Sequence, residues 1–137
     1  MRKHLGPLLV AAALSTAPAF AEPTFVGIWY SANQPDEPGV LSLIEFRADG
    51  TFREEFRKCE SGTVVGLQSE SGTWTVKDGI ERLTVDMLNG DATKIDGTYT
   101  VLRLTEGERH VRMEPEGHVF VSHRVAKFEF PDCPSGV

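Results

Sequence analysis

Three histidines near the C-terminal end are the first residues whose types could do chemistry. His110, His118 and His123 lie close enough in sequence for imidazoles on neighbouring strands to converge on a metal ion. However, no His or Cys pair has the spacing of a zinc site, and His118 and His123, five positions apart, would face opposite sides of one strand. We therefore expect neither a metal nor another cofactor.

The sequence also lacks a recognisable catalytic constellation. Its serines and histidines do not show the local spacing of known nucleophilic motifs. The adjacent Glu54 and Glu55 fit solvated strand positions better than an acid–base pair. We expect a protein that binds rather than an enzyme.

Strands must position these residues, because no segment after Ala21 has a helical period. Alternating apolar and polar residues recur between turns rich in Gly, Asp, Asn and Pro. The predicted strands are residues 26–32, 40–47, 51–59, 72–77, 80–88, 95–104, 109–114 and 118–128. The longest polar connection is 60–71, ESGTVVGLQSES, which we expect to be an irregular loop.

One hairpin can be registered from the segment IEFRADGTFREEF. A two-residue Asp-Gly loop would set Phe46 opposite Arg53, an apolar side chain against a charged one. A three-residue Ala-Asp-Gly loop with a left-handed glycine instead pairs Phe46 with Phe52 and Glu45 with Arg53. We predict the second register, which puts Phe46, Phe52 and Phe56 on one face.

Eight short strands without a covering helix must hide their edges in some other way. A closed up-and-down barrel and a sandwich are the usual solutions. Since sandwiches need a long crossover and the connections here are short, the barrel is favoured. We predict an all-β, eight-stranded antiparallel up-and-down barrel.

Aromatic residues on the strand faces could line a cavity inside such a barrel. They are Phe46, Phe52, Phe56, Trp74 and Tyr99. An eight-stranded barrel can hold one small ligand, although in a short chain the same rings could simply fill the core. Glu54 and Lys58 share the face of Phe52, so they are either polar groups of the cavity or residues at an open, wet end. Because unpaired charges are costly to bury, the wet end is favoured.

Residues 1–21, MRKHLGPLLVAAALSTAPAFA, have the basic start, short apolar stretch and Ala-Phe-Ala end of a secretory signal. Cleavage after Ala21 would leave one domain, residues 22–137, and would move the formal charge from −6 to −8. Such an acidic chain argues against nucleic acid as a partner. No other apolar segment is long enough for a bilayer, and no cysteine at the cleavage point offers a lipid anchor. We expect a periplasmic or secreted protein.

Export changes the interpretation of the two cysteines. Cys59 and Cys133 are 74 positions apart without a CxxC motif, so in an oxidising compartment a structural disulfide is favoured over a redox pair or a metal site. The alternative is two reduced, buried thiols.

The segment Gly27-Ile28-Trp29 resembles the Gly-x-Trp signature on the first strand of lipocalins and the wider calycin barrels. The resemblance implies that the glycine allows close backbone approach and that Trp29 closes one end of the barrel. It also implies that Arg124, on the last strand, packs over that indole. A disulfide tying the tail to the middle of the barrel is another family habit, which Cys59 and Cys133 fit. The chain is shorter than typical lipocalins and lacks their long tail helix.

Two functions are considered at this level, beside the possibility of an envelope accessory protein whose barrel is only a scaffold. The first is an exported lipocalin-like protein that binds a small apolar or amphipathic molecule inside the barrel. The second is a periplasmic inhibitor of lysozyme or of a secreted protease, acting through a loop such as 60–71. The acidic charge of the chain would suit a basic enzyme such as lysozyme. The segment Ser71-Gly72-Thr73-Trp74 resembles the inhibitory motif of the lysozyme inhibitors only in part.

Overall fold

The computed structural model describes residues 24–34 and 37–135. The predicted signal segment, residues 1–21, lies outside the described residues. The eight strands are β1 (Gly27–Gln34), β2 (Glu37–Phe46), β3 (Thr51–Glu60), β4 (Thr63–Lys77), β5 (Ile80–Leu88), β6 (Asp91–Leu104), β7 (Glu108–Glu114) and β8 (Val119–Val125). Within the described part of the chain, no helix is long and apolar enough to cross a membrane.

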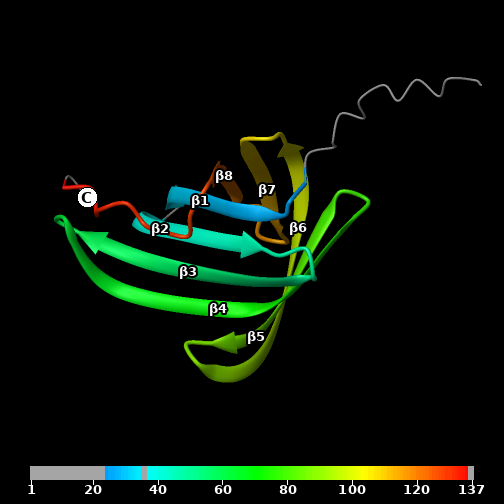
Figure 1. The fold of residues 1–137 in the computed structure, drawn as a ribbon, viewed down its shortest axis with the longest axis horizontal. Helices are drawn as coiled ribbons and strands as arrows, with labels where there is room; N and C mark the ends of the chain where they lie inside the picture. Colours follow the sequence, from blue (N-terminus) through cyan, green and yellow to red (C-terminus); the bar gives the residue numbers. More distant parts are fainter. Residues whose placement is uncertain (1–23, 35–36, 136–137) are drawn as a thin grey trace, which may run out of the picture.

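The strands form a closed barrel in sequence order, as predicted (Figure 1). Every neighbouring pair is antiparallel, and β8 returns to pair with β1, where Trp29 lies opposite Arg124. Closure leaves no sheet edge with unpaired backbone groups along this seam. This closure, rather than a covering helix, protects the edges of the meander.

The β2–β3 hairpin has the predicted register. Phe46 pairs with Phe52 and Glu45 with Arg53, and the Arg53 Nε lies 2.9 Å from the Glu45 carboxylate. Gly50 has a φ of +86°, the left-handed conformation that a three-residue loop ending in glycine requires. Both phenylalanines are 1% exposed, so the paired face is the inner face of the barrel.

The predicted loop at 60–71 is wrong, because most of it belongs to β4. A tight turn at Ser61 and Gly62, both with positive φ, joins β3 to β4, and the two strands then pair from Glu60 opposite Thr63 to Thr51 opposite Thr73. The sequence does not indicate this strand because its inner face carries Gly66, Gln68 and Glu70 rather than apolar residues. The pattern of apolar inner and polar outer residues that predicts a strand is therefore missing. Other strand ends differ by a few residues: β2 and β6 begin earlier than predicted, and β8 ends at Val125.

Apolar residues fill one end of the barrel only. The buried cluster consists of Phe25, Trp29, Ile44, Phe46, Phe52, Leu83, Val85 and Val111. It lies toward the β2–β3, β4–β5 and β6–β7 turns, which we call the packed end. The opposite end, near Glu37, Lys58 and His118, is hollow.

Candidate ligand-binding cavity

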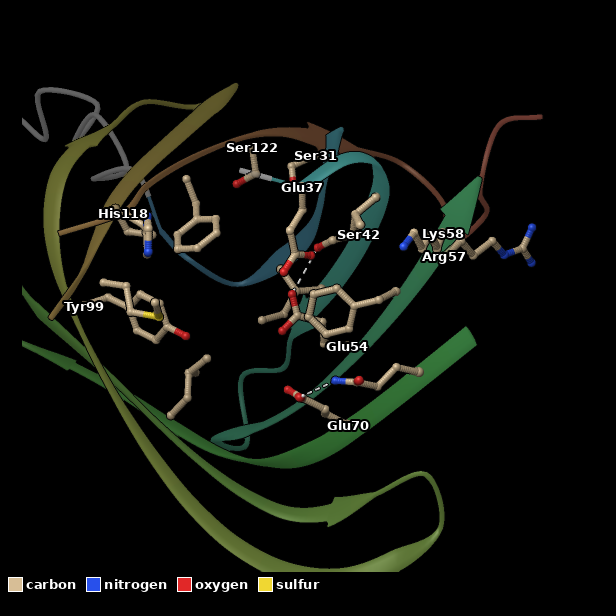
Figure 2. A pocket seen from close by; sticks show the side chains of 18 of the residues that line it. Ser31, Glu37, Ser42, Glu54, Arg57, Lys58, Glu70, Tyr99, His118 and Ser122 are labelled. Carbon is tan, nitrogen blue, oxygen red and sulfur yellow. Dashed lines mark hydrogen bonds between the residues drawn. The ribbon is translucent and has the colours of Figure 1, made fainter. Parts of the chain in front are cut away.

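A cavity of about 700 Å³ occupies the barrel between the packed core and the opposite end (Figure 2). The exposed residues Glu37, Lys58 and Leu67 belong to its lining, so the cavity opens to solvent at that end. Inward-facing positions on neighbouring strands form the rest of the wall, because alternate residues of a strand share one face. Residues from all eight strands therefore contribute to the wall of the cavity.

A buried ion pair lies between the core and the cavity. The guanidinium of Arg109 on β7 donates from Nη2 to both carboxylate oxygens of Glu81 on β5, at 2.6 and 2.8 Å, and from Nε at 3.0 Å. Its Nη1 donates to the Ser122 hydroxyl at 3.3 Å. The Glu81 side chain is 0% exposed and that of Arg109 is 7% exposed. The guanidinium also lies 5.1 Å from the Phe46 ring centre, so it joins the polar layer to the aromatic core.

Two further carboxylates face the cavity from adjacent strands. Glu54 on β3 and Glu70 on β4 are directly opposite partners, and Figure 2 shows both side chains directed into the same space. Glu54 accepts a hydrogen bond from the Ser42 hydroxyl at 3.0 Å, and Glu70 accepts one from the Gln68 amide at 3.0 Å. Like charges directly opposite each other destabilise a strand pair. The two facing acids would therefore repel each other if both were ionised.

The surroundings shift the protonation of these acids. Burial, and next the facing carboxylate of Glu70, raise the pKa of Glu54 to about 8. Burial also raises the pKa of Glu70. On the opposite wall, burial followed by the negative charge of Glu54 raises the pKa of the Tyr99 phenol, which therefore remains a hydrogen-bond donor.

Aromatic and aliphatic side chains form the rest of the wall. Phe56, Tyr99, Phe120 and Met113 line the cavity, and the rings of Tyr99 and Phe120 meet edge to face at 6.4 Å. The lining is therefore amphipathic, with acids concentrated on β3 and β4 and aromatic rings on β3, β6 and β8.

The five aromatic residues predicted to line a cavity divide into two groups. Phe56 and Tyr99 lie in the cavity wall. Phe46 and Phe52 are in the buried core beneath it, and Trp74 packs against that core with its indole N–H donating to the Arg47 carbonyl at 2.9 Å. Strand parity places all inner-face rings inside the barrel, but it does not say at which height the interior becomes hollow.

Charged residues of the interior were only partly anticipated. Glu54 was expected at the wet end, yet it lies inside the cavity, whereas Lys58 is indeed exposed near the opening. Glu70 was missed because its segment was taken for a loop. Glu81 and Arg109 were missed as well, although Glu81 shares the inward parity of Leu83 and Val85 and could have been found by that signal.

The Gly-x-Trp segment closes the packed end of the barrel. The Arg124 guanidinium lies 4.3 Å from the Trp29 ring centre and donates to the carbonyls of Thr24, Val26 and Glu106, each at 2.7 Å. Gly27 has a φ of +135°, and a Cβ at this position would run into the Arg124 guanidinium. Glycine is therefore required both by the backbone conformation and by the space that the arginine occupies.

The two cysteines form a disulfide with a Cα–Cα distance of 5.6 Å, which connects the end of β3 to the C-terminal tail.

The histidines at positions 110, 118 and 123 lie apart from one another. His118 faces the cavity, the Nε2 of His110 is hydrogen-bonded to the Glu108 carboxylate at 3.0 Å, and His123 is exposed. Among the described residues, no group of three His, Cys, Asp or Glu side chains is arranged to hold a metal ion.

A closed meander barrel with one end sealed by tryptophan and arginine, and with a cavity at the other, defines a lipocalin-like barrel. The chain belongs to the family of the lipocalin-like domain, whose family model matches residues 25–108. The match confirms the resemblance seen in the sequence. No curated protein matches the chain significantly.

Proposed function

We propose that this protein binds a small molecule with an apolar or amphipathic body inside the barrel. The observation that carries the proposal is the cavity of about 700 Å³ above the buried core, within the size range of roughly 300–1,000 Å³ typical of ligand sites. Its walls combine apolar surface for affinity with a few polar groups for orientation. We propose binding without catalysis.

The protein is proposed to work outside the cytoplasm. The Cys59–Cys133 disulfide supports this, because such bonds persist in oxidising compartments. Expression of the full chain in a bacterial host, followed by fractionation and N-terminal sequencing, is expected to give a periplasmic product that begins at Glu22. A product that retains residues 1–21 in the cytoplasm would contradict this part of the proposal.

Binding can be tested with an uncharged, environment-sensitive naphthyl dye titrated into the oxidised protein. We expect saturable one-to-one binding with a rise in dye emission. Met113→Asp, which places a hydrated carboxylate in the cavity wall, should weaken binding by about tenfold or more. The matched control is Val121→Asp on the exposed face of β8, which should bind as the unchanged protein does. A folded protein that does not bind the dye would overturn the proposal.

The inhibitor alternative is not favoured by any specific observation. The loop that would have served it, residues 60–71, lies largely within β4 and is paired with β3.

A further inference from the structure

Two carboxyl groups in the cavity wall have no basic partner among the described residues. Glu54 and Glu70 face each other across β3 and β4, and Figure 2 shows the phenol of Tyr99 reaching toward them from the opposite wall. No ion pair of the described residues includes either acid; their partners are the hydroxyl of Ser42 and the amide of Gln68. When they are ionised, two acids held together in this way create a negative potential directed into the cavity.

Three basic residues belong to the cavity lining, Arg57, Lys58 and Arg109, and the Nε of Arg57 is buried without a hydrogen-bond partner in the described part of the chain. Arg109 is held by three hydrogen bonds to Glu81, whose charge it offsets. The Arg57 guanidinium lies 4.4 Å from the ring centre of Phe130 in the C-terminal tail. Lys58 follows on the same strand but is exposed near the opening. Among the described residues, none of these three basic side chains forms an ion pair with Glu54 or Glu70.

Aromatic rings border the same space. Phe56, Tyr99 and Phe120 line the cavity together with Glu54 and Glu70. The faces of aromatic rings attract cations, and the attraction grows when water is excluded. Carboxylates and aromatic rings in one partly enclosed cavity favour a positively charged group with an apolar body, and they disfavour an anion such as a fatty acid.

Building on the proposed function, we propose that the ligand is an organic cation, a compound whose ammonium or guanidinium group lies between Glu54 and Glu70 while its apolar body contacts the aromatic wall. The cation would attract the ionised forms of both acids, and would thereby favour the loss of the Glu54 proton.

Binding of a cation must then be linked to protons. The groups facing Glu54 are Ser42 from β2, Glu70 from β4, Glu81 from β5, Tyr99 from β6 and Arg109 from β7. Because the pKa of Glu54 is raised to about 8, this acid carries a proton at neutral pH when the cavity is empty. A bound cation favours the ionised form, so binding releases the proton and affinity rises with pH toward the pKa of Glu54.

The test uses three probes that share a phenylbutyl body and end in trimethylammonium, hydroxyl or carboxylate. The trimethylammonium group does not titrate, so any pH dependence belongs to the protein. By calorimetry at roughly pH 8.5, above the pKa of Glu54, we expect the cation to bind about tenfold more tightly than the alcohol, and the carboxylate to bind most weakly. Between roughly pH 8.5 and pH 6, the affinity for the cation should fall and proton release should be measurable.

The variant Glu54→Gln/Glu70→Gln, with its fold checked by near-UV circular dichroism, should bring the affinities for the three probes together. The matched control is Glu55→Gln, which changes the neighbouring carboxylate of β3, one outside the cavity lining, and should keep the preference for the cation. His118 also lines the cavity. The single variant Glu54→Gln identifies the contribution of Glu54, because only the part of the pH dependence of binding that is due to Glu54 should disappear.

Failure of this inference is distinguishable from failure of the proposed function. Equal affinities for the three probes, or tightest binding of the carboxylate, would overturn the cation proposal while leaving a ligand-binding barrel in place. If neither the probes nor the uncharged dye bind to the folded protein, both proposals are wrong.

Discussion

At the scale of single residues, the Glu81–Arg109 pair divides the barrel into a packed and a hollow half. The guanidinium contacts Phe46 on one side and contributes to the cavity lining on the other. Both charges are desolvated, so their attraction and four hydrogen bonds, including the one to Ser122, must offset a large solvation cost. Removing only one partner should therefore lower the free energy of unfolding by much more than the small net stabilisation that the pair provides.

We expect Glu81→Gln to lower the free energy of unfolding by about 3–5 kcal/mol, because Arg109 would remain buried without its counterion. Urea unfolding followed by fluorescence measures the change. The control is Glu45→Gln, which removes the partner of Arg53 in a pair whose side chains are 24% and 42% exposed, and which should cost less than about 1 kcal/mol. Equal losses in the two variants would contradict the buried-charge argument.

The raised pKa of Glu54 also predicts how stability depends on pH. Between the unfolded value near 4.5 and the folded value of about 8, the folded protein binds more protons at this site than the unfolded chain. The free energy of unfolding should therefore fall as pH rises through this range, by at most about 5 kcal/mol. Glu54→Gln should reduce this slope, whereas Glu55→Gln should keep it. A wild-type stability that rises across the same range, with no effect of Glu54→Gln, would refute the assignment.

At the scale of elements, β4 connects the cavity to the core. Its inner face begins with Gly66, Gln68 and Glu70 in the cavity wall and ends with Trp74 and Val76 packed against the core. Between these two parts, the register with β5 shifts after Ser71. At Gly72, a Cβ would collide with the backbone of Thr84 and approach that of Asp86. The change from hollow to packed interior thus coincides with a close approach of two strands.

Gly72→Ala should destabilise the protein by about 2 kcal/mol or more, since backbone atoms cannot move aside as a flexible side chain can. The matched control on the same strand is Gly66→Ala, where the new Cβ would meet the Lys58 Cβ at an ordinary 3.5 Å. That variant should be close to neutral. Thermal unfolding of the two variants side by side provides the comparison, and similar melting temperatures would show that β5 adapts to the added methyl group.

At the scale of the whole molecule, the C-terminal tail is fastened to the outside of the barrel. After β8 the tail returns to β3, where the ring centre of Phe128 lies 3.9 Å from the guanidinium carbon of Arg53. Further along, the ring of Phe130 lies over the guanidinium of Arg57, and Cys133 forms the disulfide with Cys59. Figure 1 shows the tail ending beside the β3–β4 turn. The tail is therefore attached to β3 by one covalent bond and two cation–π contacts.

Reduction of the disulfide should lower the free energy of unfolding by about 4 kcal/mol, because the bond closes a loop with a sequence separation of 74. The double variant Cys59→Ala/Cys133→Ala should reproduce the loss without a reductant. Hydrogen exchange should then show faster exchange in residues 126–135 than in β6 and β7, which the bond does not touch. Unchanged stability after complete reduction would show that the cation–π contacts alone hold the tail.

Sequence patterns predicted what depends on local chemistry. The Phe46–Phe52 register followed from matching apolar and charged partners across a short turn, and the barrel followed from the number of strands and their short connections. The prediction failed at residues 60–71 and at Glu70, because pattern analysis assumes that the inside of a barrel is apolar. In β4 the inner positions Gly66, Gln68 and Glu70 are not apolar, and Val65 and Leu67 are exposed, so the strand does not show the pattern of an apolar inner and a polar outer face.

By itself, the sequence determined the strand order, the inward parity and the cysteines available for a bond, since these depend on alternation and on turn residues that act over a few positions. Only the tertiary structure decided where the interior changes from packed to hollow, and which acids meet there. Glu54 and Glu70 are sixteen positions apart, and Glu81 and Arg109 are twenty-eight apart. Their encounters, and the raised pKa of Glu54, arise from strand pairing and barrel closure, which bring together distant residues and remove them from water.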